Sequence, residues 1–211
     1  MSTLIRRMFG SLRQRSRAER YRHIHNVLAL DSTTGFLLDL GGGPASFFAA
    51  MFPQTGRIVL VDIDLAEARR AKRHLPALRV VVADGSRLPF ADRAFSATVC
   101  NSVIEHVTEP RVLAMEVRRV SGAYFVQTPN GRFPLETHSH VAIPMYNWLP
   151  SRRLKHWVCR LLGADYGYVS SVRYLSETQL KEFFPDASLT YEQVLGLTKS
   201  FYVTRAANTP P

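Results

Sequence analysis

The sequence predicts an α/β fold: a doubly wound, mostly parallel seven-stranded sheet with helices on both faces and an antiparallel C-terminal hairpin. From residue 36 onward, short aliphatic and β-branched runs alternate with helix-like segments, which is typical of parallel strands joined by crossover helices. After residue 188, two strand-like runs follow each other with no helix between them, which indicates an antiparallel pair. A chain of 211 residues, 46% of them hydrophobic, can bury one sizeable core.

The first part of the chain supplies five predicted strands and three predicted helices. The strands are expected at residues 36–40, 57–62, 79–83, 95–101 and 123–128. The helices are expected near 45–52, 65–74 and 109–119.

The alternation ends at Pro129. Further prolines at 134, 144 and 150 exclude a continuous helix or a central strand, so we interpret residues 130–172 approximately as a lid-like insertion. Gly196 is expected near the turn of the closing hairpin. The elements expected in this part are a helix at 154–162, a helix from its cap Ser176 through Phe184, and strands at 188–195 and 200–205.

The net charge of +10 is concentrated at one end of the chain. Residues 1–22 hold seven arginines and one glutamate, or +6, which leaves 20 basic and 16 acidic residues, or +4, for the remainder. Nucleic acid is therefore not the expected partner of the main domain. Cys100 and Cys159 have no metal-ligand or redox spacing, and no apolar stretch is long enough to span a membrane, so a cytoplasmic setting is expected.

Three consecutive glycines, Gly41, Gly42 and Gly43, follow the first predicted strand and precede a helix. In such a turn, backbone N–H groups face the crevice at the carboxyl end of the sheet, and glycine lets a ligand approach the main chain. The turn alone would suit the pyrophosphate of a dinucleotide equally well.

Carboxylates at three strand ends distinguish these ligands. Asp39, just before the glycines, suits the ammonium group of an amino acid and would repel a pyrophosphate, and Ser46 replaces the third glycine of the dinucleotide motif. Asp62 is placed to accept both ribose hydroxyls. Asp84 offers an acceptor to an adenine amine, and Ile63 could cover the ring. We therefore predict a site for a nucleoside that carries an amino acid.

At these motifs the chain resembles the class I S-adenosylmethionine-dependent methyltransferases, in the broad subgroup that acts mainly on small molecules. The resemblance covers residues 36–129 and implies a Rossmann-like fold, methyltransferase activity and S-adenosyl-L-methionine as cofactor. One departure is Pro44-Ala45, where the family often has a further glycine. The matching segments are Leu38-Asp39-Leu40-Gly41-Gly42-Gly43, Val61-Asp62-Ile63, Ala83-Asp84-Gly85-Ser86-Arg87-Leu88-Pro89-Phe90 and Phe95-Ser96-Ala97-Thr98-Val99-Cys100-Asn101-Ser102-Val103-Ile104-Glu105-His106-Val107.

The resemblance also implies roles for single residues. Gly41 and Gly43 would line the methionine part of the cofactor, while Asn101 and Ser102 would close the pocket. With the residues above, the expected cofactor site comprises Asp39, Gly41, Gly42, Gly43, Asp62, Ile63, Asp84, Gly85, Asn101, Ser102 and Tyr21.

Histidines are the candidate bases, because an oxygen nucleophile must lose a proton during methyl transfer. His106 follows the fourth strand, and His138 and His140 lie in the insertion, with Glu105 and Glu136 nearby. His138 is the first candidate, ahead of His140 and His106. The Glu136-x-His138-x-His140 pattern falls short of a recognisable ligand set, so no metal site is predicted.

The acceptor is expected to be a small molecule, glycan or lipid, methylated on oxygen. Aromatic residues such as Trp148 and Tyr146 in the insertion could line its pocket or form the core of the lid, and Trp157 is interpreted as core. The alternatives are an RNA methyltransferase or a nicotinamide-dependent reductase that uses the same turn.

Residues 1–30 are expected to form a basic helical segment ahead of the methyltransferase domain, residues 31–207. Apolar residues recur at helical spacing among the arginines, which describes a basic amphipathic helix. Through residues 1–22 it could contact an anionic membrane. It could also be a solvated leader, or a helix that caps the cofactor site with Tyr21 over the methionine end.

Overall fold

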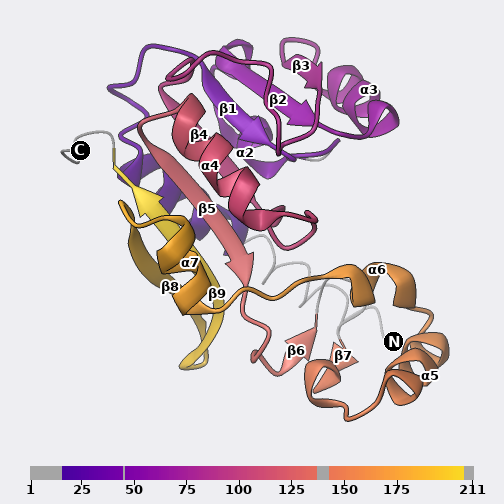
Figure 1. Cartoon of the computed structure of the whole chain (residues 1–211). Helices are drawn as coiled ribbons and strands as arrows, with labels where there is room; N and C mark the ends of the chain where they lie inside the picture. Colours follow the sequence, from indigo (N-terminus) through magenta and orange to yellow (C-terminus); the bar gives the residue numbers. More distant parts are fainter. Residues whose placement is uncertain (1–15, 45, 137–142, 207–211) are drawn as a thin grey trace.

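The computed structural model (Figure 1) describes residues 16–44, 46–136 and 143–206. One seven-stranded sheet has the order β3-β2-β1-β4-β5-β9-β8. The strands β1 to β5 run parallel, β9 is antiparallel to β5, and β8 is antiparallel to β9, so the predicted fold is confirmed. The strands are β1 Leu37–Leu40, β2 Ile58–Asp62, β3 Arg79–Val82, β4 Ala97–Asn101, β5 Tyr124–Pro129, β8 Ser188–Val194 and β9 Leu197–Arg205.

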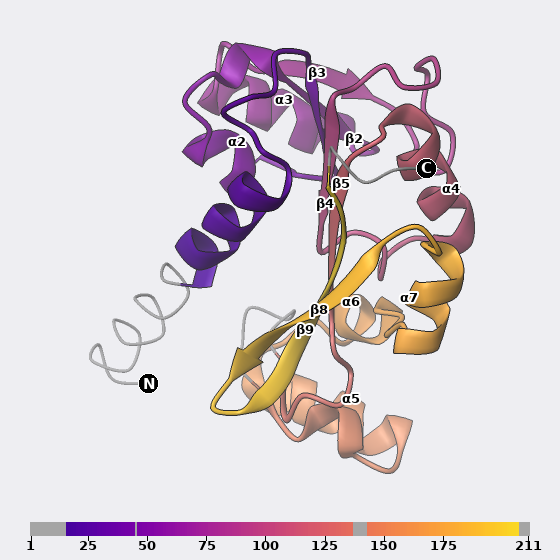
Figure 2. The same ribbon diagram turned by 90° about the vertical axis from the view of Figure 1, so that its left-hand side faces the viewer.

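Helices cover both faces of this sheet, which Figure 2 shows edge-on. A helix described over residues 16–27 lies on the same side as α2 and α3, and α4 and α7 lie on the opposite side. These helices are α2 Phe47–Met51, α3 Leu65–His74, α4 Pro110–Val120 and α7 Glu177–Phe183; a 3-10 turn, η1, spans Thr55–Arg57.

Alternating strand side chains divide the core into two layers. On one face of β1, Leu37 packs in a cluster with Ile24 of the N-terminal helix and Phe48 of α2. On the other face, Leu38 belongs to the cluster that contains Leu113 of α4 and residues of α7. The N-terminal helix is thus held to the sheet by a buried apolar face.

The strand order reverses around β1, which pairs with β2 on one side and β4 on the other. In doubly wound sheets such a switch point opens a crevice at the carboxyl ends of the strands, where ligands bind. Leu40, Asp62 and Asn101 are the last residues of the three strands concerned. Gly41, Asp62 and Asn101, three of the residues predicted for the cofactor site, therefore lie at this edge of the sheet.

The insertion after β5 folds beside that edge and has a small core of its own. Ile143, Tyr146, Cys159 and Val169 are buried together there. Its elements are β6 Leu135–Glu136, β7 Ile143–Pro144, η2 Tyr146–Trp148, α5 Arg152–Leu162 and α6 Tyr166–Ser171.

Two features of the insertion differ from the sequence interpretation. The α6 helix was not predicted, because six residues are too few to show a helical period; Asp165 caps it by accepting from the Tyr168 N–H. The interpretation of Trp157 as core was wrong, since its side chain is 58% exposed. Two residues along a helix turn the side chain by about 200°, so Trp157 faces away from the buried Cys159.

Candidate functional site

The glycine turn after β1 depends on glycine at each of its three positions. Gly41 and Gly43 have φ angles of +69° and +61°, which favour glycine. A Cβ atom at Gly41 would also clash with Val103, and one at Gly42 would overlap the carboxylate of Asp39. The Gly41 N–H donates to the Val61 carbonyl at 2.7 Å, which fixes the turn to β2.

Asp39 lies beneath this turn and is only 2% exposed. Its carboxylate accepts a hydrogen bond from the Ser46 hydroxyl, and that hydroxyl accepts from the Ala49 N–H at 2.9 Å, which caps α2. The pKa of Asp39 is raised to about 6, because burial and the charge of Asp62 together outweigh the lowering effect of the Ser46 hydrogen bond. Ser46, which replaces the third glycine of the dinucleotide motif, thus supports both the helix start and the acidic residue.

Asp62 ends β2 directly across from the turn. One of its oxygens, Oδ1, accepts from the Asp64 N–H at 3.0 Å, and the other, Oδ2, is 4.0 Å from where a Cβ of Gly43 would stand. Asp64 in turn caps α3. Ile63 is 70% exposed beside them, so an apolar side chain is available to a ligand at this edge.

Asp84 and Gly85 follow β3. The Asp84 side chain is exposed and its Oδ1 accepts from the Ser86 N–H at 2.8 Å. A Cβ at Gly85 would stand 3.1 Å from Leu113 and 3.3 Å from Leu40, so the backbone there packs closely on the core. Close packing thus favours glycine at position 85 independently of the predicted cofactor contact.

Asn101 ends β4, Ser102 follows it, and Ser102 is joined to the neighbouring strand. Ser102 has a φ angle of +56°, its N–H donates to the Gln127 carbonyl at 3.0 Å, and its hydroxyl donates to the Gln127 side chain at 2.6 Å. A serine in the left-handed region is strained, and these two bonds hold it there. The Asn101 side-chain oxygen accepts from Arg20 at 3.0 Å.

Arg20, from the N-terminal helix, is a site residue that the sequence interpretation missed. Its guanidinium donates to Asn101, to Gln127 at 3.5 Å, to the Tyr202 hydroxyl at 3.3 Å and to Glu192 at 2.8 Å. The side chains of Arg20 and Glu192 are about one-tenth exposed, at 10% and 11%. Burial alone would raise the pKa of Glu192, but the charges of Arg20 and Lys199 hold it at about 2.

A weak signal for Arg20 exists in the sequence. Arg20 precedes Ile24 and Leu28 at intervals of four, so it lies on the helix face that both of these buried residues occupy. Tyr21, which is predicted to cover the methionine end, has ring centroids 6.3 Å from Phe48 and 5.9 Å from His25, and its contact with the cofactor stays a prediction. Residues 1–15, which carry most of the predicted membrane contact, lie outside the described part.

Residues 38–126 match the family model for a methyltransferase domain. The curated relatives include the demethylmenaquinone methyltransferase of Paenarthrobacter aurescens, 29% identical over 121 residues. A second relative is an uncharacterized methyltransferase of a Mycobacterium species, 38% identical over 96 residues.

Residues 38–126 therefore match a methyltransferase domain, and the chain is similar to S-adenosylmethionine-dependent methyltransferases. This confirms the resemblance, the predicted class of enzyme and the predicted methyl donor. The first alignment covers 57% of this chain and 46% of the relative, and the second covers 44% and 38%. The methyltransferase therefore spans less than half the length of these curated relatives.

Solved structures share the fold of this methyltransferase at low identity. The N-terminal domain of EvdMO1, solved in the presence of SAH and D-fucose, has a TM-score of 0.57 at 20% identity over 90% of this chain and 82% of its own. A SAM-dependent methyltransferase from Methanosarcina mazei has a TM-score of 0.55 at 15% identity, over 86% and 94%. At these identities the likeness shows the fold alone.

The candidate base that the structure describes is His106, between β4 and α4. Its ring stacks on Tyr168 of α6, with centroids 5.3 Å apart, which joins the end of β4 to the insertion. The neighbouring Glu105 is fully buried and accepts from the Thr128 hydroxyl at 3.1 Å. His138 and His140 lie outside the described residues. Across residues 16–44, 46–136 and 143–206, no three His, Cys, Asp or Glu side chains gather as a metal site.

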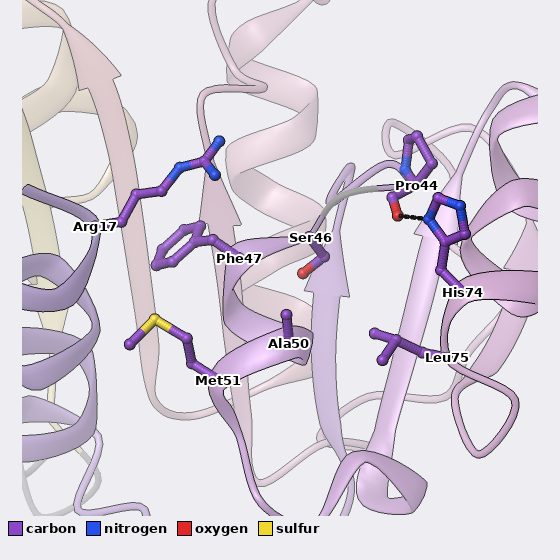
Figure 3. Close-up of a pocket in the computed structure, with 8 residues that line it drawn as sticks. All are labelled: Arg17, Pro44, Ser46, Phe47, Ala50, Met51, His74 and Leu75. Atoms are coloured by element: carbon purple, nitrogen blue, oxygen red, sulfur yellow. Dashed lines mark hydrogen bonds between the residues drawn. The ribbon is translucent and has the colours of Figure 1, made fainter. Parts of the chain in front are cut away.

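Two pockets border the methyltransferase core. The smaller one, about 470 Å³, lies between the N-terminal helix, α2 and α3 (Figure 3). Ser46 lines it, and the His74 ring bonds to the Pro44 carbonyl at 3.2 Å, but the strand-end residues Asp62 and Asn101 are not in its lining. It therefore adjoins the glycine turn from the helix side.

The larger pocket, about 810 Å³, lies between the insertion, the end of β5 and the start of α7. Its aromatic wall is formed by three tyrosines and a phenylalanine, namely Tyr146, Tyr166, Tyr174 and Phe201. Its charged side chains are Arg132, Arg152, Lys155 and Glu177. The pocket is at the same end of the sheet as the glycine turn, because β5 ends there.

Within the described ranges, no helix is long and apolar enough to cross a membrane.

Proposed function

We propose that this methyltransferase transfers the methyl group of S-adenosylmethionine to an oxygen of a small-molecule acceptor, including glycan and lipid precursors. The observation that carries the proposal is that Asp39 and Asp62 lie beside one glycine turn at the switch point of the sheet, while Asp84 follows the adjacent strand β3. Three strand-end carboxylates suit a nucleoside with an amino-acid tail and would repel a pyrophosphate.

Each cofactor residue has a proposed task. The free Oδ2 side of Asp62 accepts the ribose hydroxyls, because Oδ1 already bonds to the Asp64 N–H. Exposed Ile63 covers the adenine and Asp84 accepts its amine. The glycine backbone lines the methionine part, and the charge of Asp39 beneath the turn attracts the ammonium group. Asn101 and Ser102 close the pocket from β4.

Bound S-adenosylmethionine would supply an electrophilic methyl group on a sulfonium. The residues of this chain would hold the acceptor oxygen in line with that group and exclude water. An acceptor hydroxyl must also lose its proton, for which His106, His138 and His140 are the candidates. His106 has support from its position between the end of β4 and the insertion.

The larger pocket is the proposed acceptor site. Three cations, Arg132, Arg152 and Lys155, face a single acid, Glu177, whose carboxylate already accepts from the Tyr191 hydroxyl at 3.1 Å. With the aromatic wall, this supports an acceptor that has a ring or apolar part and an anionic group. The named comparisons, a demethylmenaquinone methyltransferase and a domain studied with D-fucose, also favour a small molecule over RNA.

Calorimetry tests the cofactor assignment. The wild-type protein should bind S-adenosylmethionine, and Asp62→Ala should weaken binding at least about tenfold, because two hydroxyl contacts are lost. Asp31→Ala is the matched control, since that carboxylate is 91% exposed and precedes the start of β1, whereas the glycine turn follows the end of β1. Equal affinity of Asp62→Ala and wild type would contradict the assignment.

A transfer assay tests the acceptor. Methyl-labelled donor is supplied with phenols, quinols, sugars, carboxylic acids and RNA in separate reactions, and each product is treated with mild base. We expect a base-stable methyl ether on an anionic small molecule, because the larger pocket is cationic. Label on RNA alone, or on nitrogen, would refute the proposed acceptor.

A further inference from the structure

Helix α5 carries an apolar stripe on its surface. Leu154, Trp157 and Leu161 recur at helical spacing and are 36%, 58% and 66% exposed. The opposite side of the helix, at Cys159, closes the small core of the insertion. The stripe therefore has no partner within the part of the chain that the structure describes.

The charges on α5 all have one sign. Its 11 residues include Arg152, Arg153, Lys155 and Arg160 and no aspartate or glutamate. At about 100° per residue, Arg153 and Arg160 lie within about 60° of Trp157 around the helix axis. Both arginines are exposed. A row of cations thus runs alongside the apolar stripe.

A stripe of this kind is different from a single exposed apolar residue. Leu195, at the tip of the β8–β9 hairpin, is 98% exposed, but isolated residues of this sort are ordinary on protein surfaces. Trp148, in the 3-10 turn just before α5, is a further exposed aromatic, at 57%. The insertion thus concentrates large apolar side chains next to arginines.

We propose that the exposed face of α5 docks on the headgroup region of an anionic phospholipid bilayer. Leucines would enter the boundary of the acyl chains, a tryptophan suits the interface, and arginines pair with lipid phosphates. The absence of acidic residues from α5 is the charge complementarity that favours an anionic membrane over a second copy of this basic chain. This inference does not depend on which acceptor is methylated.

Docking through α5 would bring the acceptor pocket to the membrane. Arg152 and Lys155 belong to the same helix and line that pocket. A lipid-borne acceptor could then reach the site without crossing bulk water.

Vesicle binding by the full-length chain tests this proposal. The protein is sedimented with phosphatidylcholine vesicles, with and without phosphatidylglycerol, and its tryptophan fluorescence is recorded, since Trp148 and Trp157 are its two tryptophans. We expect co-sedimentation and a blue shift with anionic vesicles only. Replacing both Trp157 and Leu161 by serine should weaken binding by about tenfold or more. Leu195→Ser, at a still more exposed position, should leave it unchanged.

Three results would overturn the proposal. The first is failure of the wild-type protein to sediment with anionic vesicles. The second is binding of the double variant as strong as that of wild type, which would assign the binding to another segment such as residues 1–15. A wild-type dimer in sedimentation velocity that the double variant abolishes would instead assign the stripe to a second copy. Circular dichroism confirms folding of the variants, which is expected because both side chains are exposed.

Discussion

The guanidinium of Arg20 lies 2.8 Å from the carboxylate of Glu192, which joins the N-terminal helix to β8 across 172 positions of the sequence. The same guanidinium bonds to Asn101 and Gln127, at the ends of β4 and β5. The helix is therefore fastened to the edge of the sheet that carries the proposed cofactor site. Arg20 acts there as a positioning residue, through the strand ends that it holds.

Replacing Arg20 should destabilise the protein. Arg20→Leu should lower the free energy of unfolding by about 3 kcal/mol at neutral pH, because it leaves Glu192 buried with Lys199 as its remaining cation. The difference should be constant above pH 4.5 and shrink as the pH falls toward about 2, since the stabilising charge of Glu192 is lost through that range. Urea titrations of both proteins measure it. Exposed Arg22, mutated to leucine, is the control, and an equal effect there would refute the argument.

Asp39 should make stability depend on pH in the opposite sense. The folded carboxyl, with its pKa at about 6, holds a proton more tightly than the unfolded one at 3.8, so folding is favoured least above about pH 6. Asp39→Asn removes this ionisation. Relative to wild type, the free energy of unfolding of Asp39→Asn should rise by about 3 kcal/mol as the pH increases from below the unfolded pKa of Asp39 to above its folded pKa. A pH-independent difference would show that the Asp39 carboxyl is not perturbed by burial.

Ser46 supplies a matched test of the same carboxyl. The Ser46 hydrogen bond lowers the pKa of Asp39. Ser46→Ala should therefore shift the pH interval over which the stability changes to higher pH. The variant should also lose about 1 kcal/mol at every pH, since the hydroxyl caps α2. Asp39→Asn combined with Ser46→Ala should keep only the second effect. Thermal unfolding across pH separates the two contributions.

Much of the fold could be predicted because it follows from local patterns. Strands such as Ile58–Asp62 are uninterrupted aliphatic runs, and the switch from crossover helices to a hairpin is visible at residue 188. The short helix α6 could not be predicted, because its support comes from the burial of Val169 against α5. Trp157 was misassigned for a related reason. The periodicity of α5 shows an apolar face but not which side meets the protein.

The residues of the candidate site could likewise be predicted from the sequence only in part. Gly41, Asp62 and Asp84 stand beside strand ends, so their convergence follows from the topology of the sheet. The contacts of Arg20 with Glu192 join the two ends of the chain, and a single sequence contains no local signal for such a pair. The sequence could reveal only that Arg20 shares a helix face with buried residues. The hydrogen-bond partners of Arg20 could be identified only from the folded structure.

Two glycines of the turn should respond differently to alanine. Gly41→Ala should be strongly destabilising, because φ is +69° and the added Cβ meets Val103. Gly43→Ala, at a φ of +61° with open space, should cost about 1–2 kcal/mol. Yet Gly43→Ala should weaken S-adenosylmethionine binding at least about tenfold in calorimetry, because the new methyl group lies on the side of Asp62. Full affinity in that variant would exclude the turn as the methionine site.

His106 should affect turnover and leave cofactor affinity intact. If His106 removes the acceptor proton, His106→Ala should lower kcat by about 100-fold or more and abolish the acid limb of the pH–rate profile. His156→Ala is a matched control, because His156 also lies against a tyrosine, with its ring centroid 4.9 Å from that of Tyr166. Loss of a histidine–tyrosine ring contact alone should have a similar effect in both variants, although the His156 ring meets its tyrosine edge-on. A similar, small loss of kcat in both would assign His106 a structural role and leave His138 and His140 as the candidate bases.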